Sequence, residues 1–304
     1  MSWRRHHCQS RESTNPRSSA TVERVSRDAP TTADEAIDYV RQPLDYPVHY
    51  AHGPDSERQP GVPEGRVVPL DLGDSVVYPG TTRAVQLYVP AQYSPGEPAA
   101  VIVFQDGQLY LDPAGEIRAG VVLDNLIHRG EMPVTIGVFV DPGNPGNRNE
   151  EYDPADDRFA RFLVEEVMPI VREQVSVTDD PDRWAICGGS SGGNCAFTVA
   201  WNRPDRFRRV ISFVGSFAQM PGGNPYPALI RSTAPAKPLR IFLQAGSRDL
   251  NWDQPAENWY SNNLLVAAAL AERSYDHRLV LGDGGHSTNH GGVILPDALR
   301  WIWR

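Results

Sequence analysis

The sequence contains little cysteine and no long apolar segment. Its three cysteines, Cys8, Cys187 and Cys195, are too few and too irregularly placed for a disulfide framework, and no CxxC pair indicates a zinc or redox motif. We expect Cys187 and Cys195 to be small core residues. No apolar run approaches the ~20 residues of a membrane span, and the amino end lacks the apolar core of a secretory signal. These absences predict a cytoplasmic protein without a membrane partner.

An excess of positive charge is also lacking. The 304 residues include 29 Lys and Arg against 38 Asp and Glu, which gives a net charge of −9. Because phosphate binding requires a basic face, this balance argues against nucleic acid as a partner. The hydrophobic share of 40% and the charged share of 22% are ordinary for a globular protein. A chain of this length can bury a large core, which is consistent with one α/β domain.

The first residues differ in composition from the rest. Residues 1–33 are polar and rich in arginine, and we predict a disordered tail. Residues 34–64 are rich in proline and are predicted to form an irregular extension that packs on the core. Residues 65–304 are predicted to form a single domain, without internal repeats.

Apolar runs alternate with helix-like segments through this domain. Two β-rich runs at 65–72 and 81–90, separated by a turn sequence, are expected to be antiparallel edge strands. Further apolar, strand-like runs lie at 99–107, 134–141, 183–189, 208–216, 239–247 and 276–285. Helical patterns lie near 117–130, 158–175, 191–202, 255–273 and 295–303. The alternation predicts an α/β fold with a mostly parallel central sheet flanked by helices and antiparallel strands at its N-terminal edge.

A cluster of glycine and serine, GGSSGG at 188–193, follows one of these apolar runs. Parallel α/β sheets place their chemistry just past the carboxyl ends of the strands. The G-x-S-x-G motif holds a nucleophilic serine in a strained turn between strand and helix, where glycines allow close backbone approach. A phosphate-binding turn is the competing interpretation, but no Walker lysine follows and the GxGxxG spacing is absent.

The motif fits two registers. Ser190 is the central serine of residues 188–192, and Ser191 is the central serine of residues 189–193. We favour Ser190, because the other register leaves an extra glycine in the strand end, where it costs stability. Ser191 would then supply a backbone N–H to an oxyanion hole and cap the following helix.

A nucleophilic serine needs a histidine base, and the base needs a carboxylate that holds its tautomer. In α/β-hydrolases these residues follow in the order serine, acid, histidine. Of the eight histidines only His277, His286 and His290 follow the serines. We predict His286 as the base, because it lies in a glycine-rich loop directly after the last strand. His277 opens that strand, and His290 lies at the start of the next helix. The spacing of His286 and His290 would suit zinc, but no third ligand is apparent, so no metal or cofactor is predicted.

The acid and the second oxyanion donor are expected in loops that follow other strands of the sheet. Asp249 follows a strand and precedes a helix, so it is the first choice for the acid. Asp253 lies further from the strand end and is the second choice. The loop after an early strand offers the backbone N–H groups of Gly107 and Gln108 as oxyanion donors, with Asp106 as a brace.

Together these residues resemble the putative-esterase family of α/β-hydrolases, in particular its enterochelin-esterase-like branch. The resemblance covers about residues 34–304 and rests on motifs that include VIVFQDGQLY, NRNEEYDP, GGSSGG, QAGSRDLN and GGHSTNHGG. The family elbow carries two glycines after the residue that follows the nucleophile, which matches Gly192 and Gly193 when Ser190 is the nucleophile. The resemblance implies an α/β-hydrolase catalytic domain at 65–304 that hydrolyses a small-molecule, siderophore-like or carbohydrate ester through an acyl-enzyme.

The resemblance also implies a loop near the mouth of the active site, which is RNEEY in this chain. Arg148, Glu150 and Tyr152, together with His290, are candidates for substrate contact, and a surface salt bridge is the alternative for Arg148. Enterochelin esterases carry an additional amino-terminal domain, and residues 1–64 are too short and irregular to form one. A bulky trilactone is therefore not the expected substrate.

Two other functions are compatible with the same residues. An acyltransferase would use the triad to pass the acyl group to a sugar or lipid hydroxyl, and a non-catalytic binding protein would keep the fold without the activity. Because candidates for all three triad roles occur in the expected order, we favour the esterase. The sequence does not indicate an oligomeric state.

Overall fold

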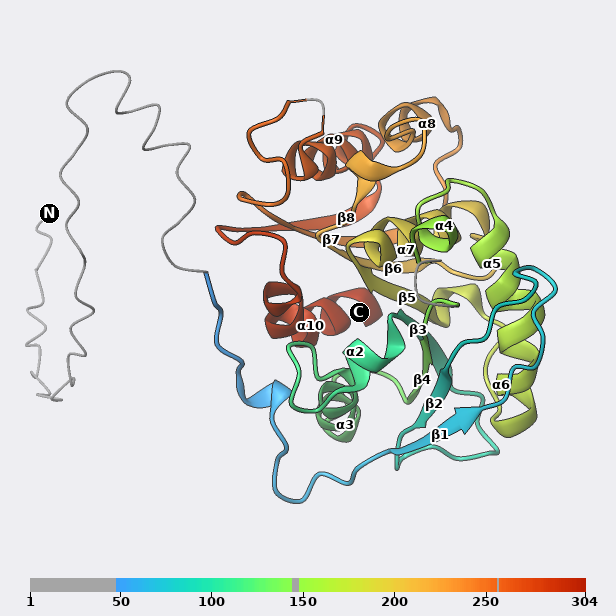
Figure 1. Cartoon of the computed structure of the whole chain (residues 1–304). Helices are drawn as coiled ribbons and strands as arrows, with labels where there is room; N and C mark the ends of the chain where they lie inside the picture. The colour runs from blue at the N-terminus through green and yellow to red at the C-terminus, as the bar shows by residue number, and fades with distance from the viewer. Residues whose placement is uncertain (1–47, 144–147, 256) are drawn as a thin grey trace, which may run out of the picture. The chain divides into compact units, whose positions relative to one another are not determined.

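The computed structural model describes residues 48–143, 148–255 and 257–304. The predicted tail and residues 34–47 of the predicted extension lie outside the described residues. An eight-stranded sheet with the order β1-β2-β4-β3-β5-β6-β7-β8 forms the centre of the described chain (Figure 1). The strands are β1 (Arg66–Leu70), β2 (Val85–Val89), β3 (Ala100–Gln105), β4 (Thr135–Val140), β5 (Trp184–Gly189), β6 (Arg209–Phe213), β7 (Arg240–Gly246) and β8 (Asp276–Gly282).

The strand directions match the predicted sheet. All neighbouring pairs from β4 to β8 are parallel. Strand β2 pairs antiparallel with both β1 and β4. The prediction of a mostly parallel sheet with antiparallel strands at its N-terminal edge is therefore confirmed.

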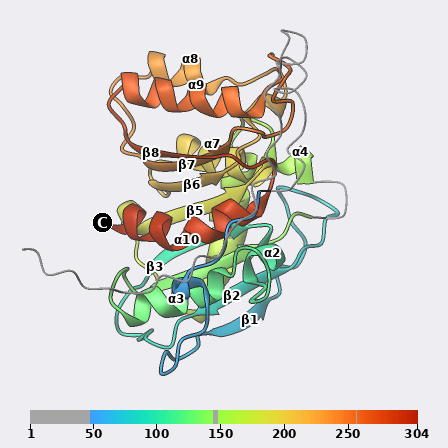
Figure 2. The same ribbon diagram turned by 90° about the vertical axis from the view of Figure 1, so that its left-hand side faces the viewer.

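Helices cover both faces of the sheet. One face carries α2 (Gly107–Leu111), α3 (Ala119–His128) and α10 (Thr288–Trp303), and Figure 2 views the molecule from the side of α3 and α10. The other face carries α5 (Arg158–Phe162), α6 (Met168–Gln174), α7 (Ser191–Asn202) and α9 (Trp259–Glu272). The short helix α8 (Tyr226–Ser232) packs against α9, and α4 (Arg148–Tyr152) lies against α7.

Burial on both faces explains the continuous apolar runs of the central strands. Every residue of β3 and β5 is buried. In β3, Val101 and Val103 belong to the core on one face, whereas Ile102 and Phe104 belong to the core on the other. Side chains alternate between the two faces of a strand, so a strand that is covered on both faces is apolar at nearly every position. Cys187 and Cys195 are both buried, which confirms their predicted place in the core.

Two helices differ from the predicted patterns. The predicted helix at 158–175 is divided by a π-helical turn, Leu163–Val167, just before Pro169. Proline has no N–H to donate to the preceding turn, so the regular helical hydrogen bonds change at this point. Helix α10 begins at Thr288, seven residues before the predicted start at 295. The short helices α2, α4 and α8 have no clear periodic signal in the sequence.

The described part of the predicted extension contacts α3 and α10. Tyr50 N donates to Asn289 Oδ1 (2.7 Å), and Asn289 Nδ2 donates to Tyr50 O (3.1 Å). Asn125 Nδ2 donates to Asp55 O (2.9 Å), and the Arg300 guanidinium pairs with the Asp55 carboxylate (2.6 Å). These bonds hold Tyr50 at the start of α10 and Asp55 between α3 and the end of α10.

Gly292 marks the closest approach of α10 to its neighbours, and it provides a test of the packing. A Cβ at this position would lie 2.7 Å from the carbonyl carbon of Glu116 and 2.8 Å from the Cα of Ile117. We expect Gly292→Ala to lower the free energy of unfolding by about 1–3 kcal/mol, because backbone atoms have little room to move. Urea denaturation measures this change.

The matched control is Gly120→Ala in α3. A Cβ on Gly120 meets only Leu111 Cδ2, at 3.9 Å. Alanine is the better helix former by ~1 kcal/mol, so this variant should be as stable as the wild type or slightly more stable. Equal unfolding midpoints for the two alanine variants would contradict the packing described for α10.

Candidate active site

The strained turn predicted by the glycine-serine cluster lies at Ser190. This residue follows β5, precedes α7 and has φ 58° and ψ −127°, a conformation that is uncommon for any residue except glycine. Its N–H donates to Phe213 O (2.9 Å), and its carbonyl accepts from Gly193 N (2.8 Å). Ser191 is the first residue of α7. The backbone therefore assigns the central position of the elbow to Ser190.

Glycine is required on both sides of this turn. A Cβ on Gly188 would overlap the carbonyl of Gly192 and the side chain of Gln105. A Cβ on Gly193 would lie 2.9 Å from Ser212 Oγ and 3.0 Å from the Cα of Gly215. The helix α7 can approach the end of β5 and the turn after β6 only because these Cβ atoms are absent.

Ser190, His286 and Asp249 form a hydrogen-bonded series. His286 Nε2 lies 2.8 Å from Ser190 Oγ, and His286 Nδ1 lies 2.6 Å from Asp249 Oδ1. Each residue follows a different strand: Ser190 follows β5, Asp249 follows β7 and His286 follows β8. A carboxylate only accepts hydrogen bonds, so Nδ1 carries the ring proton and Nε2 accepts from the Ser190 hydroxyl. The arrangement can remove a proton from Ser190.

The environment of Asp249 directs its charge toward His286. The side chain is fully buried, and Oδ1 also accepts from Leu250 N (2.8 Å). Oδ2 has no hydrogen-bond partner among the described residues. The indole of Trp259 packs edge-on against the imidazole of His286, with ring centroids 6.2 Å apart. A buried carboxylate with few other donors stabilises a positive charge on the neighbouring imidazole.

The alternative acid and bases lie elsewhere. His290 Nδ1 is 3.2 Å from Gln244 Nε2, its ring stacks on Tyr50, and burial lowers the pKa of His290. His277 opens β8, and its Nδ1 contacts the carbonyl of Tyr275 (3.0 Å). Asp253 is exposed. The structure therefore brings Asp249 and His286 to Ser190, holds His277 and His290 in other contacts and leaves Asp253 exposed.

The predicted oxyanion donors are placed at two helix starts. Ser191 is buried at the start of α7, whereas Gly107 and Gln108 begin α2. Gln108 N donates to Asp141 Oδ1 (3.0 Å), and burial raises the pKa of Asp141. The N–H of Gln108 is thus engaged with a carboxylate.

The prediction that Ser191 caps α7 is wrong. Ser190 occupies the capping position, and its hydroxyl contacts His286 instead of the helix backbone. The Ser191 side chain lies near Asp153 instead. Burial raises the pKa of Asp153, and the neighbouring Ser191 and Asn149 side chains oppose this shift. A positive φ at Ser190 turns its side chain away from the helix, so it cannot serve as the cap.

Arg148 joins the loop after β3 to the elbow. Its Nε and Nη2 donate to the two carboxylate oxygens of Asp106 (2.7 and 2.8 Å), and Nη2 also donates to Gly189 O (3.2 Å). Burial disfavours the charged guanidinium, but the Asp106 carboxylate raises the pKa of Arg148. Tyr152 is fully buried with its hydroxyl 3.4 Å from Asp106 N, whereas Glu150 is exposed. The arginine and the tyrosine thus brace this loop.

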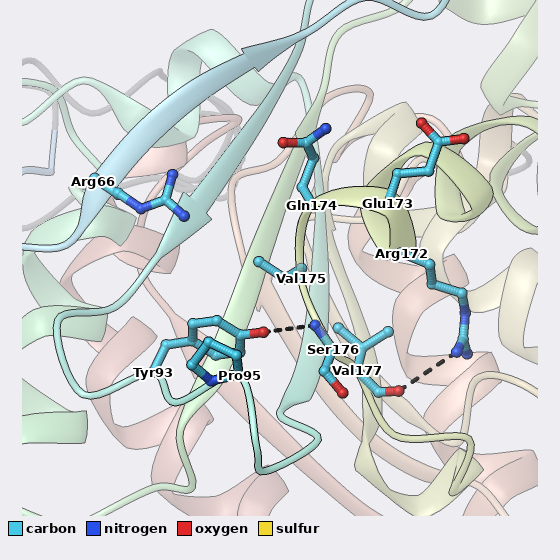
Figure 3. A pocket seen from close by; sticks show the side chains of 9 residues that line it. All are labelled: Arg66, Tyr93, Pro95, Arg172, Glu173, Gln174, Val175, Ser176 and Val177. Carbon is cyan, nitrogen blue, oxygen red and sulfur yellow. Dashed lines mark hydrogen bonds between the residues drawn. The ribbon is translucent and has the colours of Figure 1, made fainter.

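Cavity size alone does not locate the chemistry. A cavity of about 490 Å³ lies near Arg66, Tyr93 and Arg172 (Figure 3). It is at the edge where the parallel strands begin, opposite to Ser190, and Tyr93 Oη accepts there from Ser176 N (2.6 Å). A cavity of similar size, about 480 Å³, lies beside α4. It is lined by Asn149, Glu150, Asp153, Pro154, Arg158 and Pro221. Asp153, which lines this second cavity, accepts a hydrogen bond from Asn149 Nδ2 (2.9 Å).

Two residues near Ser190 were not predicted from the sequence. Ser216 Oγ lies 3.1 Å from Ser190 Oγ, and Trp259 Nε1 donates to Ser216 Oγ (3.0 Å). The position of Ser216 after β6, at the same edge of the sheet as Ser190, Asp249 and His286, was the available signal.

The described residues contain neither a cluster suited to a metal ion nor a membrane-spanning helix. Within residues 48–143, 148–255 and 257–304, no group of three or more His, Cys, Asp or Glu side chains is placed to hold a metal ion. No helix in the same ranges has the length and apolar character needed to cross a membrane.

Comparisons with known proteins identify the family of the chain. The model of the family Esterase, described as "Putative esterase", matches residues 77–301. An iron(III) enterobactin esterase of Dickeya dadantii is 25% identical over 276 residues, which cover 84% of this chain and 60% of that protein. The protein of the same name from Escherichia coli K12 is 30% identical over 157 residues, which cover 50% of this chain and 38% of that protein. The chain thus spans 60% or less of the length of these curated relatives.

Solved structures show the same fold. The enterobactin esterase of Shigella flexneri superposes with a TM-score of 0.67 at 22% identity, over 82% of this chain and 61% of that one. A ferulic acid esterase of Anaeromyces mucronatus superposes with a TM-score of 0.62 at 17% identity, over 81% of this chain and 93% of that one. The described domain therefore has the α/β-hydrolase fold. Since the family model matches residues 77–301, well over half of the chain, the chain belongs to the putative esterase family.

Proposed function

We propose that the protein is a serine carboxylic-ester hydrolase. The observation that carries the proposal is the hydrogen-bonded series of Ser190, His286 and Asp249 at the carboxyl ends of three parallel strands. The family supports the same activity, and two of the curated relatives are named as enterobactin esterases.

The first half of the reaction forms an acyl-enzyme. Ser190 Oγ attacks the carbonyl carbon of the ester while its proton passes to His286 Nε2. The buried Asp249 carboxylate stabilises the imidazolium and holds Nδ1–H in place. His286 then gives the proton to the leaving alcohol oxygen, and the acyl group remains on Ser190.

The second half restores the serine. Water takes the place of the alcohol, and His286 removes its proton as the water oxygen attacks the acyl carbon. The bond to Ser190 Oγ breaks, the carboxylic acid leaves, and His286 returns the proton to Ser190. An acyltransferase would differ only here, since a sugar or lipid hydroxyl would replace water.

Backbone donors stabilise the oxyanion in both halves. We assign the first donor to Ser191 N–H, because it opens α7 and follows the nucleophile directly. The second comes from Gly107 or Gln108 at the start of α2. Because Gln108 N donates to Asp141 Oδ1, an oxyanion at that position would compete with the Asp141 carboxylate.

The substrate is a small-molecule ester, with siderophore-like and carbohydrate esters as the classes to test. The cavity beside α4 could receive one side of it, with Glu150 exposed there. We assign Arg148 and Tyr152 to bracing the loop at Asp106, since their polar groups are engaged with that residue.

The two serines are separated by covalent labelling. We expect Ser190→Ala to abolish reaction with a fluorophosphonate, because the alkoxide-forming hydroxyl is lost, whereas Ser191→Ala should still be labelled. Peptide mass spectrometry after labelling locates the adduct. An adduct on Ser191 would overturn the assignment, and a wild-type protein that is folded but never labelled would favour the non-catalytic binding function.

Steady-state kinetics separate the candidate bases and acids. Loss of the base removes proton transfer, so His286→Ala should lower kcat by on the order of 10⁴ with little change in KM. His290→Ala should lower kcat by about tenfold or less, because only packing against Tyr50 is lost. The kcat of Asp249→Asn should lie between those of His286→Ala and the wild type. The kcat of Asp253→Asn should be close to that of the wild type. The reverse order within either pair would show that the loops are assigned wrongly.

Chelation tests the zinc alternative for His286 and His290. The two ring nitrogens of His286 are already engaged, Nε2 with Ser190 and Nδ1 with Asp249. His290 Nδ1 contacts Gln244. We therefore expect full esterase activity after exhaustive dialysis against EDTA. Activity that disappears on dialysis and returns with added zinc would contradict this expectation.

A further inference from the structure

A second buried serine lies against the proposed nucleophile. Ser216 has no exposed surface, and its Oγ is 3.1 Å from Ser190 Oγ. On its other side it accepts a hydrogen bond from Trp259 Nε1 (3.0 Å). Two hydrogen bonds in series, from Trp259 through Ser216, therefore reach Ser190 Oγ in addition to its contact with His286.

The residues at the two ends of this series fix its direction. An indole N–H can only donate, so Trp259 donates to Ser216. At the other end the Asp249 carboxylate can only accept, which leaves His286 Nε2 as the acceptor for the Ser190 proton. Ser190 Oγ then has lone pairs and no further proton, so Ser216 is the donor of the bond between the two serines.

The turn that carries Ser216 is strained. Val214 has φ 42°, and a positive φ is a genuine outlier for a β-branched residue. Such backbone strain persists only where the surrounding structure imposes it, and it concentrates at functional sites. The strained residue here lies two positions before Ser216.

Several hydrogen bonds impose this conformation. Val214 N donates to Gln244 O (2.8 Å), and Asn263 Nδ2 donates to Gly215 O (2.8 Å). Ser190 and the turn exchange two more bonds, since Ser190 N donates to Phe213 O and Ser216 N donates to Ser190 O (3.0 Å). The turn after β6 is thereby fixed directly to the backbone of the nucleophile.

We propose that Ser216 is a positioning residue that donates a hydrogen bond to Ser190 Oγ throughout the reaction. The proposal rests on the proposed esterase function. When the Ser190 proton passes to His286 and Oγ attacks, the negative charge that develops on Oγ strengthens the bond from Ser216. The Ser216 O–H bond itself stays intact. The same donor stabilises Oγ when it leaves the acyl group in the second half of the reaction.

The expected effect is on kcat rather than on KM, because Ser216 is fully buried and cannot touch the substrate. Ser216→Ala should lower both kcat and the second-order rate of fluorophosphonate labelling by about tenfold, the effect of one hydrogen bond. Trp259→Phe should also lower kcat and the labelling rate, but by a smaller factor. If Trp259 acts through Ser216, the double variant should be no slower than Ser216→Ala alone.

Ser212→Ala is the matched control. Ser212 is buried at β6 beside the same turn, and its Oγ has no hydrogen-bond partner in the described part of the chain. Its labelling rate should equal that of the wild type, and thermal unfolding of each variant shows whether it is folded.

The outcomes separate this proposal from the function on which it rests. A tenfold slower labelling of folded Ser216→Ala, with Ser212→Ala unchanged, supports the role of Ser216. Labelling of Ser216→Ala at the wild-type rate overturns the role of Ser216 but not the esterase function. An equal loss of labelling rate in Ser212→Ala has the same meaning. A folded wild-type protein that is not labelled at all overturns the esterase function itself and this role with it.

Discussion

The positive φ of Ser190 is the constraint on which the rest of the site depends. It turns the hydroxyl out of α7 toward His286, and it persists because chain segments far apart in the sequence pack against it. The turn after β6 accepts and donates backbone hydrogen bonds at Ser190, and Arg148 binds the carbonyl of Gly189 just before it. Glycine at 188 and 193 permits these approaches.

Two carboxylates near this turn have their charge balanced in different ways. Asp249 lies on the side of the base, fully buried, and its charge has the imidazole of His286 as its main partner. Asp106 lies on the side of the proposed oxyanion hole, where Arg148 neutralises it through two hydrogen bonds. A free carboxylate near an oxyanion would oppose its formation, so this pairing keeps the negative charge of Asp106 from acting on the reacting oxygen.

Much of the fold and of the candidate site follows from the sequence. The central strands are apolar at almost every position because both faces are covered, and the carboxyl ends of parallel strands meet at one edge, which brings Ser190, Asp249 and His286 together. The contacts of Ser216 with Trp259 and of Arg148 with Asp106 could not be predicted. They join residues that are 43 and 42 positions apart, and their partners are chosen by packing, not by local pattern. Short helices such as α4 are likewise fixed by tertiary contacts.

The central claim is that an ester's acyl group is transferred to Ser190. The most direct measurement is rapid acid quenching of the wild-type protein during turnover of an aryl ester, followed by mass spectrometry of its peptides. We expect a peptide that carries the acyl group on Ser190 and that disappears as the substrate is exhausted. An acyl group on Ser191, or steady release of product with no acylated peptide at any time, would contradict it.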